Sequence, residues 1–417
     1  MTVRLLGVLG LMLLSGCGLP PPAPGRVPPP TPASPALPAL TSAAPVERTI
    51  ASGERHHYDL DLAAGRYVQV TVRSLDARPS VVLTGPAGEV LAEGGATPRA
   101  GEQAVSAVVS AAGLHRLEVA LADGPAGGGS YRAVLAERPA GSGDGARVAA
   151  QRLLARALIE RPFAQLGFSE ALRLAGEAGA TSGHALAADA LNGLGDLRFE
   201  EGDYRAALVL FEQALAEARA GDAAWAEAYA INNLAVVLEV LNRLDEATVH
   251  SCEAIARWQR LGEAAQQAET LIGLGNLRVK QADGAGATAA FGRALALFES
   301  QGATLGEARA WNGLGLAARQ LGELDDALAA YGRALGLARR AGAGGLEVSI
   351  LRNFAAAHRR RGELQEALRL NLTALATGAG SSRTRSKVQH DIATLYVDLG
   401  NLEQARASYE QALETLP

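Results

Sequence analysis

The sequence predicts a multidomain chain in which a small all-β sandwich is followed by an all-α solenoid of helical hairpins. Two patterns lead to this fold class. From residue 46 to residue 138, short segments alternate apolar and polar residues and are separated by glycines, as β-strands and their turns are. After residue 145, small and aromatic residues recur about every 40 positions. With 417 residues the chain is also longer than one ordinary domain.

Composition narrows the class of partner. Hydrophobic residues make up 48% of the chain and aromatic residues only 4%, which suits closely packed helices better than a core of large rings. A net charge of -5 with few aromatic residues argues against nucleic acid, which binds basic surfaces and stacking rings. We therefore expect no nucleic-acid partner, and no small-molecule cofactor is expected either.

The first residues have the pattern of an export signal. Arg4 precedes an apolar run from Leu5 to Leu14, and small residues follow. This run is too short to span about 30 Å of hydrocarbon as a helix. The sequence therefore predicts a signal peptide over residues 1–16 and not a transmembrane anchor.

The end of that signal, Leu14-Ser15-Gly16-Cys17, resembles the lipobox of bacterial lipoproteins. The resemblance implies cleavage before Cys17 and acylation of this cysteine, for example with palmitate. Several acyl chains would hold the protein durably, since each buried methylene contributes about 0.8 kcal/mol. Gly18 stands where aspartate would resemble an inner-membrane retention signal, so in a double-membraned bacterium the outer membrane is expected, with the protein on the periplasmic or outer face of the envelope. The alternative is an ordinary secretory signal with an incidental cysteine.

A proline-rich tether is expected between the lipidated cysteine and the first domain, over residues 17–45. It contains Pro20-Pro21-Pro22 and Pro28-Pro29-Pro30. Such a segment favours extended polyproline conformations and could reach roughly 80 Å at about 3.1 Å per residue. It would let the following domains clear a membrane surface.

Residues 46–140 are predicted to form the β-sandwich, because about seven short strands in this length are typical of sandwich spacing. The segments HYDLDLAAGRYVQVTV, LTGPAGEVLA and AAGLHRLEVAL are similar to the pre-peptidase C-terminal family, which implies a jelly roll. Asp59, Asp61, Asp76 and Glu89 could be calcium ligands. A solvated strand face is the favoured explanation, because Asp59 and Asp61 alternate with apolar neighbours.

The helical part is internally repetitive. In each predicted hairpin, one position of the first helix holds a small residue that lets two helices approach closely. One position of the second helix often holds an aromatic residue. The small positions are Gly195, Ala235, Gly275, Gly315, Ala355 and Ala393, at steps of 40, 40, 40, 40 and 38. The second set is Phe211, Ser251, Phe291, Tyr331, Asn371 and Tyr409. Each hairpin would lack a complete core until its neighbour covers it.

Two segments in the fourth repeat, WNGLG at 311–315 and GELDDALAAYGRAL at 322–335, resemble the tetratricopeptide signature. The resemblance covers residues 185–416, and a degenerate hairpin at 149–178 is expected before it. The predicted fold is therefore a small all-β jelly-roll sandwich followed by an all-α tetratricopeptide-type superhelical solenoid of about six to seven hairpins, over residues 146–417.

The tetratricopeptide resemblance also implies a concave groove lined by the first helix of each hairpin. The aligned positions are acidic at one end and basic at the other, so that a bound peptide would point its acidic end toward the fifth repeat. The alternative is an ordinary solvated face with i,i+4 charge pairs. The predicted groove residues are Asp189, Asn192, Asp196, Tyr229, Asn232, Asn276, Arg309, Asn312, Arg319, Arg352, Arg359, Arg360, Lys387 and His390.

Sequence patterns that would indicate a catalytic site are weak. His250 and Cys252 are two residues apart on a helix, which turns their side chains about 200° apart, so a nucleophile and base pair is not expected. Cys252 is expected to be a small buried residue. His56 and His57 point to opposite sides of a strand and cannot grip one metal together; both are expected at the surface. No HExxH, GxSxG or paired-cysteine spacing occurs.

These observations favour a non-enzymatic, membrane-anchored scaffold that binds proteins or peptides in its groove. The arrangement also resembles the amino-terminal part of bacterial proteins that carry a caspase-like CHAT peptidase domain. The alternative function is therefore the regulatory or substrate-recruiting half of such a peptidase, with its catalytic domain on another segment or chain. A third hypothesis makes the sandwich a carbohydrate or cell-wall binder.

Overall fold

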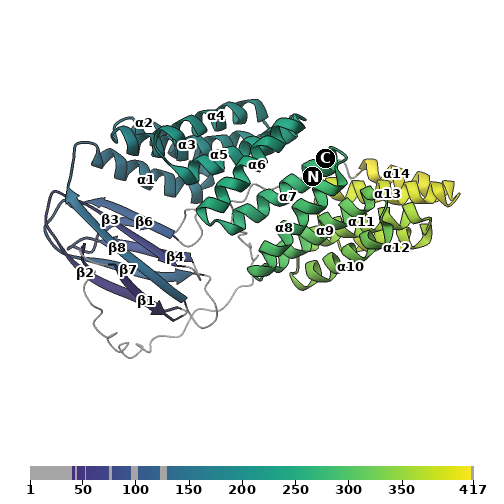
Figure 1. Ribbon diagram of the computed structural model, residues 1–417, viewed down its shortest axis with the longest axis horizontal. Coiled ribbons are helices and arrows are strands. Elements are labelled where there is room, and N and C mark those ends of the chain that lie inside the picture. Colours follow the sequence, from purple (N-terminus) through teal and green to yellow (C-terminus); the bar gives the residue numbers. More distant parts are fainter. Residues whose placement is uncertain are drawn as a thin grey trace, which may run out of the picture. The chain divides into compact units, whose positions relative to one another are not determined.

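The computed structural model describes residues 40–42, 45–51, 53–74, 78–94, 102–122 and 129–414. The chain divides into two compact units, residues 1–223 and residues 224–417. Unit 1 holds the strands and the first four helices, and unit 2 holds the other helices (Figure 1). The predicted signal peptide and Cys17 lie outside the described residues, as does most of the predicted tether.

The strands of unit 1 form a jelly roll, as the sequence predicts. Two antiparallel four-stranded sheets have the orders β1-β8-β3-β6 and β2-β7-β4-β5 (Figure 1). Apart from β4 and β5, which pair in one sheet, sequence neighbours alternate between the sheets, in the double Greek-key order of that fold. The strands are β1 Val46–Ile50, β2 Arg55–Leu62, β3 Arg66–Ser74, β4 Arg78–Thr84, β5 Val90–Gly94, β6 Glu102–Val108, β7 Gly113–Ala122 and β8 Gly129–Pro139.

The inner face of the sandwich follows the alternation of the sequence. On β2, Tyr58, Leu60 and Leu62 are buried, and the residues between them are exposed. His56 is on the same inner face, so its expected surface position was wrong: the period of two that buries Tyr58 also buries His56. Its Nδ1 lies 2.7 Å from the Tyr131 hydroxyl, which lies 2.6 Å from the Tyr58 hydroxyl. Burial raises the pKa of both tyrosines.

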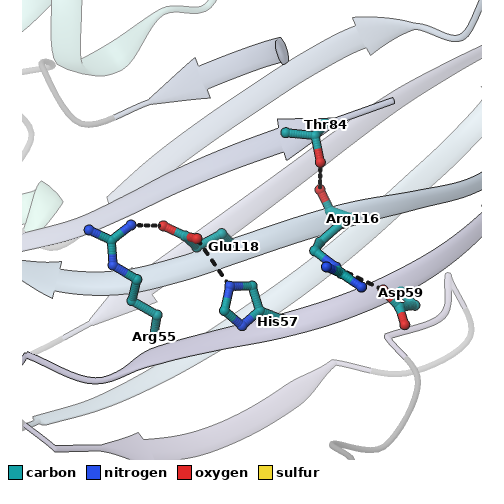
Figure 2. A network of polar contacts seen from close by, with 6 residues as sticks. All are labelled: Arg55, His57, Asp59, Thr84, Arg116 and Glu118. Carbon is teal, nitrogen blue, oxygen red and sulfur yellow. Dashed lines mark hydrogen bonds and ion pairs between the residues drawn. The ribbon is translucent and has the colours of Figure 1, made fainter. Parts of the chain in front are cut away.

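Cross-strand charge pairs cover the outer face of the second sheet. Figure 2 shows Glu118 of β7 between Arg55 and His57 of β2, with its Oε2 3.0 Å from His57 Nε2. Arg116 Nε donates to Asp59 over 3.2 Å. Asp59 is thus exposed and paired across the strands, as expected for a solvated strand face. Among the described residues no group of three or more His, Cys, Asp or Glu could hold a metal ion.

The helices are arranged as consecutive antiparallel hairpins, and aspartates cap some of them: Asp203 accepts from Ala206 N–H and Asp283 from Gly286 N–H. None of the described helices is apolar over enough of its length to cross a bilayer. Unit 1 contains α1 Asp144–Ile159, the 3₁₀ turn η1 Arg161–Phe163, α2 Ala164–Ala175, α3 Ala180–Glu200 and α4 Tyr204–Ala220. Unit 2 contains α5 Ala224–Val240, α6 Leu244–Leu261, α7 Ala264–Lys280, α8 Gly284–Ser300, α9 Thr304–Leu321, α10 Leu324–Arg340, α11 Gly344–Arg361, α12 Leu364–Ala376, α13 Ser382–Asp398 and α14 Leu402–Glu414.

The sandwich is joined to α1 by a buried carboxylate. Asp144 accepts two hydrogen bonds of 2.6 Å from Arg138 at the end of β8, and one of 2.7 Å from Gly141 N–H. The Arg138 guanidinium holds the pKa of Asp144 below its usual range. Arg138 and Arg147 also lie over the ring of Tyr67, 4.4 and 5.1 Å from its centroid. This contact fixes the direction in which the first helix leaves the sheet.

Aromatic rings inserted against glycines determine how closely the helices of unit 2 pack. Phe291 of α8 is fully buried between Gly275 of its own hairpin and Gly313 of the next. A Cβ atom on Gly275 would lie 2.5 Å from the ring, and one on Gly313 would lie 2.4 Å from it. Tyr331 meets Gly315 in the same way. Where a repeat combines a glycine with a ring, the 40-residue pattern of the sequence is therefore a pattern of ring-to-backbone contacts.

We expect Gly275→Ala to lower the free energy of unfolding of unit 2 by about 1–3 kcal/mol, because the added methyl group overlaps the buried Phe291 ring. The matched control is Gly292→Ala in α8, where the new Cβ meets nothing within 4 Å. There alanine should stabilise the helix by up to about 1 kcal/mol. Urea denaturation followed by circular dichroism compares both; equal effects of the two substitutions would contradict the packing role of Gly275.

Candidate functional site

The predicted groove residues lie on the first helices of their hairpins. In unit 1, Asp189 and Asp196 of α3 are half-buried, and Asn192 is buried. In unit 2, the predicted residues on α5, α7, α9 and α11 are half-buried or exposed, and Lys387 and His390 of α13 are exposed. Of the predicted groove residues, the exposed basic ones therefore lie on α11 and α13 of unit 2.

Charged residues on neighbouring first helices of unit 2 pair with one another about one repeat apart. Arg309 Nη1 lies 2.5 Å from Glu269 Oε1, and Lys280 Nζ lies 2.8 Å from Glu239 Oε1. Further along, Arg352 pairs with Asp391 at 2.7 Å and Arg359 with Asp398 at 2.5 Å. We call this set of contacts the inter-repeat ladder. The Asp398 carboxylate also raises the pKa of Arg359.

Neutral groups add further contacts to the inter-repeat ladder. Thr270 Oγ1 donates to Asn232 Oδ1 over 2.8 Å, and Asn353 Nδ2 to Asn312 Oδ1 over 3.0 Å. Arg360 Nη1 donates to the carbonyl oxygen of Arg319 over 2.8 Å. Predicted groove residues thus connect adjacent hairpins of unit 2, in addition to any contact they make with a partner.

The inter-repeat ladder changes the electrostatics expected from sequence. Arg309 of α9 and Arg352 and Arg359 of α11 face carboxylates of the adjacent first helix, not an open basic wall and not an i,i+4 partner on their own helix. Sequence reasoning missed Glu269, Asp391 and Asp398 as partners. The signal that could have found them is opposite charge at a spacing of about one repeat on the same face.

A pocket of about 550 Å³ lies where α11, α13 and α14 meet. His390 packs edge-on against Tyr409, with ring centroids 5.4 Å apart. In the part of the chain that the structure describes, the Lys387 ammonium has no hydrogen-bond or ion-pair partner. The pocket therefore combines an apolar wall with a cationic rim. Its lining includes Arg352, Lys387, His390, Asp391, Tyr409 and Leu413.

An aromatic cluster stands near the start of unit 2. Trp225 is stacked on Tyr229 of the predicted groove set, with centroids 5.2 Å apart and 14° between the planes. Trp258 packs edge-on against Trp225 and is buried. Beside them, Arg257 of α6 pairs with the buried Glu227. This end of the unit offers a half-buried aromatic surface, whereas α13 offers exposed cations.

Cys252 is exposed, so its expected burial was wrong. The inward face of α6 is formed by Ser251, Ile255 and Trp258, and Cys252 lies outside that stripe. His250 is half-buried on a different side of the helix. The pair therefore does not form a nucleophile and base.

Family comparisons match the second half of unit 2. A tetratricopeptide repeat model matches residues 306–379, and a second tetratricopeptide repeat model matches residues 386–415. The sequence matches none of the curated proteins with which it was compared. Together with the strand order, the helical hairpins and their 40-residue period, these matches give the fold: a small all-β jelly-roll sandwich followed by an all-α tetratricopeptide-type solenoid.

Solved structures with a similar helical part have low identity. Aspartyl phosphate phosphatase F from Bacillus subtilis has 14% identity and a TM-score of 0.48, over 65% of this chain and 71% of that chain. A tetratricopeptide repeat protein from Parabacteroides merdae has 15% identity and a TM-score of 0.47, over 64% and 93%. PilF of Pseudomonas aeruginosa has 20% identity and a TM-score of 0.41, over 54% and 90%.

The inter-repeat ladder should be measurable as a coupling energy. We expect Arg309→Glu alone to lower the unfolding free energy of unit 2 by about 1 kcal/mol, because it faces Glu269 with a like charge; the pair is partly exposed, which limits the effect. The charge swap Arg309→Glu with Glu269→Arg should restore most of the loss in a double-mutant cycle. The exposed pair Arg406 and Glu410 is the control, with an expected coupling of about 0.5 kcal/mol or less. A swap that restores nothing would contradict the ladder.

Proposed function

We propose that this protein is a lipid-anchored scaffold of the cell envelope that captures a partner protein through the last hairpins of unit 2. The observation that carries the proposal is the pocket between α11, α13 and α14, with the exposed cations Lys387 and His390 at its rim. It lies in the part of the chain that the tetratricopeptide repeat models match. Repeats of this kind generally bind protein partners along the surface that stacked hairpins form.

The chemistry of the pocket favours a protein segment with acidic and apolar side chains. Arg352 is already paired with Asp391, so the positive charge still open to a ligand comes from Lys387 and, when protonated, His390. Tyr409 and Leu413 supply apolar surface for a neighbouring side chain. Such a combination binds by an apolar anchor and is oriented by charge. The proposal assigns no catalytic reaction and no cofactor to the chain.

The membrane part of the proposal rests on the lipobox-like Leu14-Ser15-Gly16-Cys17 and on the proline-rich residues that follow. Acyl chains on Cys17, palmitate among them, would hold the protein at the outer membrane. A tether over residues 17–45 would place the sandwich and the repeats in the periplasm, away from the lipid surface.

The alternative proposal is the regulatory or substrate-recruiting half of a CHAT-type peptidase. What favours it is the order of the chain, a jelly roll that resembles the pre-peptidase C-terminal family followed by tetratricopeptide-type hairpins. Its test is a search for a caspase-like chain that co-purifies with this protein and cleaves a substrate only in its presence. A scaffold without a peptidase partner predicts no such dependence.

Anchoring can be tested with the two cysteines of the chain. In cells fed a labelled palmitate analogue, we expect the full-length protein to be labelled and to sediment with membranes. Cys17→Ser should abolish the label and move the protein to the soluble fraction, because the acylated residue is lost. Cys252→Ser is the matched control and should keep both. Retained label in Cys17→Ser would refute the lipoprotein assignment.

Partner capture can be tested with a photo-crosslinking amino acid in place of His390 in the anchored protein. Illumination should give discrete adducts, and Lys387→Glu should reduce them by about tenfold, since a hot-spot charge is reversed at the pocket rim. Arg383→Glu on the same helix changes the net charge equally without touching the pocket, and should leave the adducts in place. Lys387 is preferred to Arg352 or Arg359, whose replacement also breaks the inter-repeat ladder. Equal adducts from all variants would contradict the site.

A further inference from the structure

We infer that the C-terminal turns of α9 and α11 bind a phosphate group of a partner segment through Arg319 and Arg360. The inference rests on the proposed scaffold function and adds a second contact site to the groove, since neither arginine lines the pocket near α14. Two observations carry it. Among the described residues, these arginines have no carboxylate partner, and two buried hydrogen-bond donors at the same place have no acceptor.

Arg319 and Arg360 differ from the other arginines of the predicted groove. Arg309, Arg352 and Arg359 each pair with a carboxylate of an adjacent first helix. Neither Arg319 nor Arg360 has an ion-pair partner in the part of the chain that the structure describes. Their positive charge is therefore open to an anion from outside.

The exposure of both arginines belongs to the middle of unit 2. The helix α9 packs against α7 and α11, and α11 also packs against α13. With these neighbours in place, Arg319 is half-buried and Arg360 is exposed. Their accessibility therefore comes from the groove surface and not from the last hairpin.

Helix capping explains only part of this arrangement. Both arginines lie in the last turn of a helix, where a cation offsets the partial negative charge of the helix end. Arg360 Nη1 also donates to the carbonyl oxygen of Arg319 over 2.8 Å, which joins the two turns. The other guanidinium nitrogens of Arg360 make no hydrogen bond to the described residues.

The donors that capping does not explain are buried. Arg319 Nε and the Tyr331 hydroxyl are shielded from solvent, and neither makes a hydrogen bond of good geometry to the described residues. Burial raises the pKa of Tyr331 to about 12, and the nearby Arg319 guanidinium opposes this rise, so the two groups lie close together. Because Arg319 as a whole is half-buried, its side chain connects these donors with the groove. An oxygen atom of a bound anion would supply the missing acceptor.

The number of open donors selects the anion. They come from Arg319 of α9, Tyr331 of α10 and Arg360 of α11. A phosphate monoester offers three acceptor oxygens and a charge of about −1.5 to −2 at pH 7. A carboxylate offers only two oxygens and one charge. Guanidinium groups also bind phosphate oxygens in pairs, so a phosphate satisfies more of these donors than an acidic side chain does.

A segment held at the pocket of the proposed function can reach this site. Arg352 of the pocket lining and Arg360 are both on α11, roughly 12 Å apart along its axis at about 1.5 Å per residue. About four extended residues span this distance. A partner segment with a phosphorylated side chain is therefore the proposed source of the phosphate.

The first probe is inorganic phosphate, added to the full-length protein with isotope-labelled arginine. We expect a saturable shift of the Arg319 Nε–H signal in NMR spectra, assigned from its absence in Arg319→Lys. Arg360→Gln should weaken binding by about fivefold or more, because a charged contact is lost. Arg361→Gln is the matched control: it removes the same charge from a side chain that pairs with Asp325 and Glu363, and should leave the binding unchanged.

Tyr331→Phe separates binding from packing. It keeps the ring that meets Gly315 and removes only the hydroxyl, so the melting temperature should not fall. Phosphate binding should still weaken by about threefold. Acetate at equal ionic strength should bind at least about fivefold more weakly than phosphate, since it has fewer acceptor oxygens. No saturable shift, equal binding of acetate, or the same loss in Arg361→Gln would overturn the inference.

The source of the phosphate is tested with the peptide acetyl-Ala-Ala-phosphoserine-Ala-Ala-amide. Tighter binding of this peptide than of inorganic phosphate supports a protein segment in the groove. Equal binding would overturn that source and assign the site to a small soluble phosphate ester.

The two proposals fail separately. Lys387→Glu alters the pocket and should leave phosphate binding unchanged; loss of phosphate binding in this variant would place the anion in the pocket and overturn the inference. If phosphate does not bind while adducts at position 390 form and depend on Lys387, the scaffold function stands without this site. If no adducts form in the anchored protein, the scaffold function fails whether or not phosphate binds.

Discussion

The aromatic ring that is buried between two helix backbones is the contact on which the helical part depends. Phe291 can lie against both Gly275 and Gly313 only because neither residue has a Cβ atom. The contact couples consecutive hairpins, since one glycine belongs to the hairpin of the ring and the other to the next. A hairpin is therefore complete only when a further helix covers it.

Polar contacts follow the same one-repeat spacing on the first helices. In the inter-repeat ladder, Arg309, Arg352 and Arg359 each pair with a carboxylate of an adjacent hairpin. Partly exposed pairs of this kind add little stability each, but they limit which charges are open to a partner. Lys387 differs from these arginines because it has no ion-pair partner among the described residues. Counting basic residues along the groove therefore overstates its positive potential, and the charges that could steer a partner are those without such a pair.

Sequence reasoning succeeded where a pattern is local or strictly periodic. The alternation in β2 placed Leu60 inside and Asp59 outside, and the 40-residue period located Gly275 and Phe291 as packing partners. It failed where a side chain meets a residue that is far away in the chain. The hydroxyl that meets the buried ring of His56 belongs to Tyr131 of β8, and the partner of Arg352 lies 39 residues later. Such contacts depend on which strands and helices are neighbours, and composition and periodicity do not state this.

The two units differ in what covers the outer faces of their helices. In unit 1, α1 lies against β5 and β6, Arg152 donates to the Leu91 carbonyl oxygen, and Asp144 holds the helix to the end of β8. The sandwich thus covers part of the surface of α1. In unit 2, α14 packs on α13, and Leu413 of α14 remains largely in solvent. Stacked hairpins have an apolar face for each neighbour, and a face that a domain covers contributes to the fold. Leu413 instead lines the pocket that has Lys387 and His390 at its rim, so this apolar surface is accessible in the part of the chain that the structure describes.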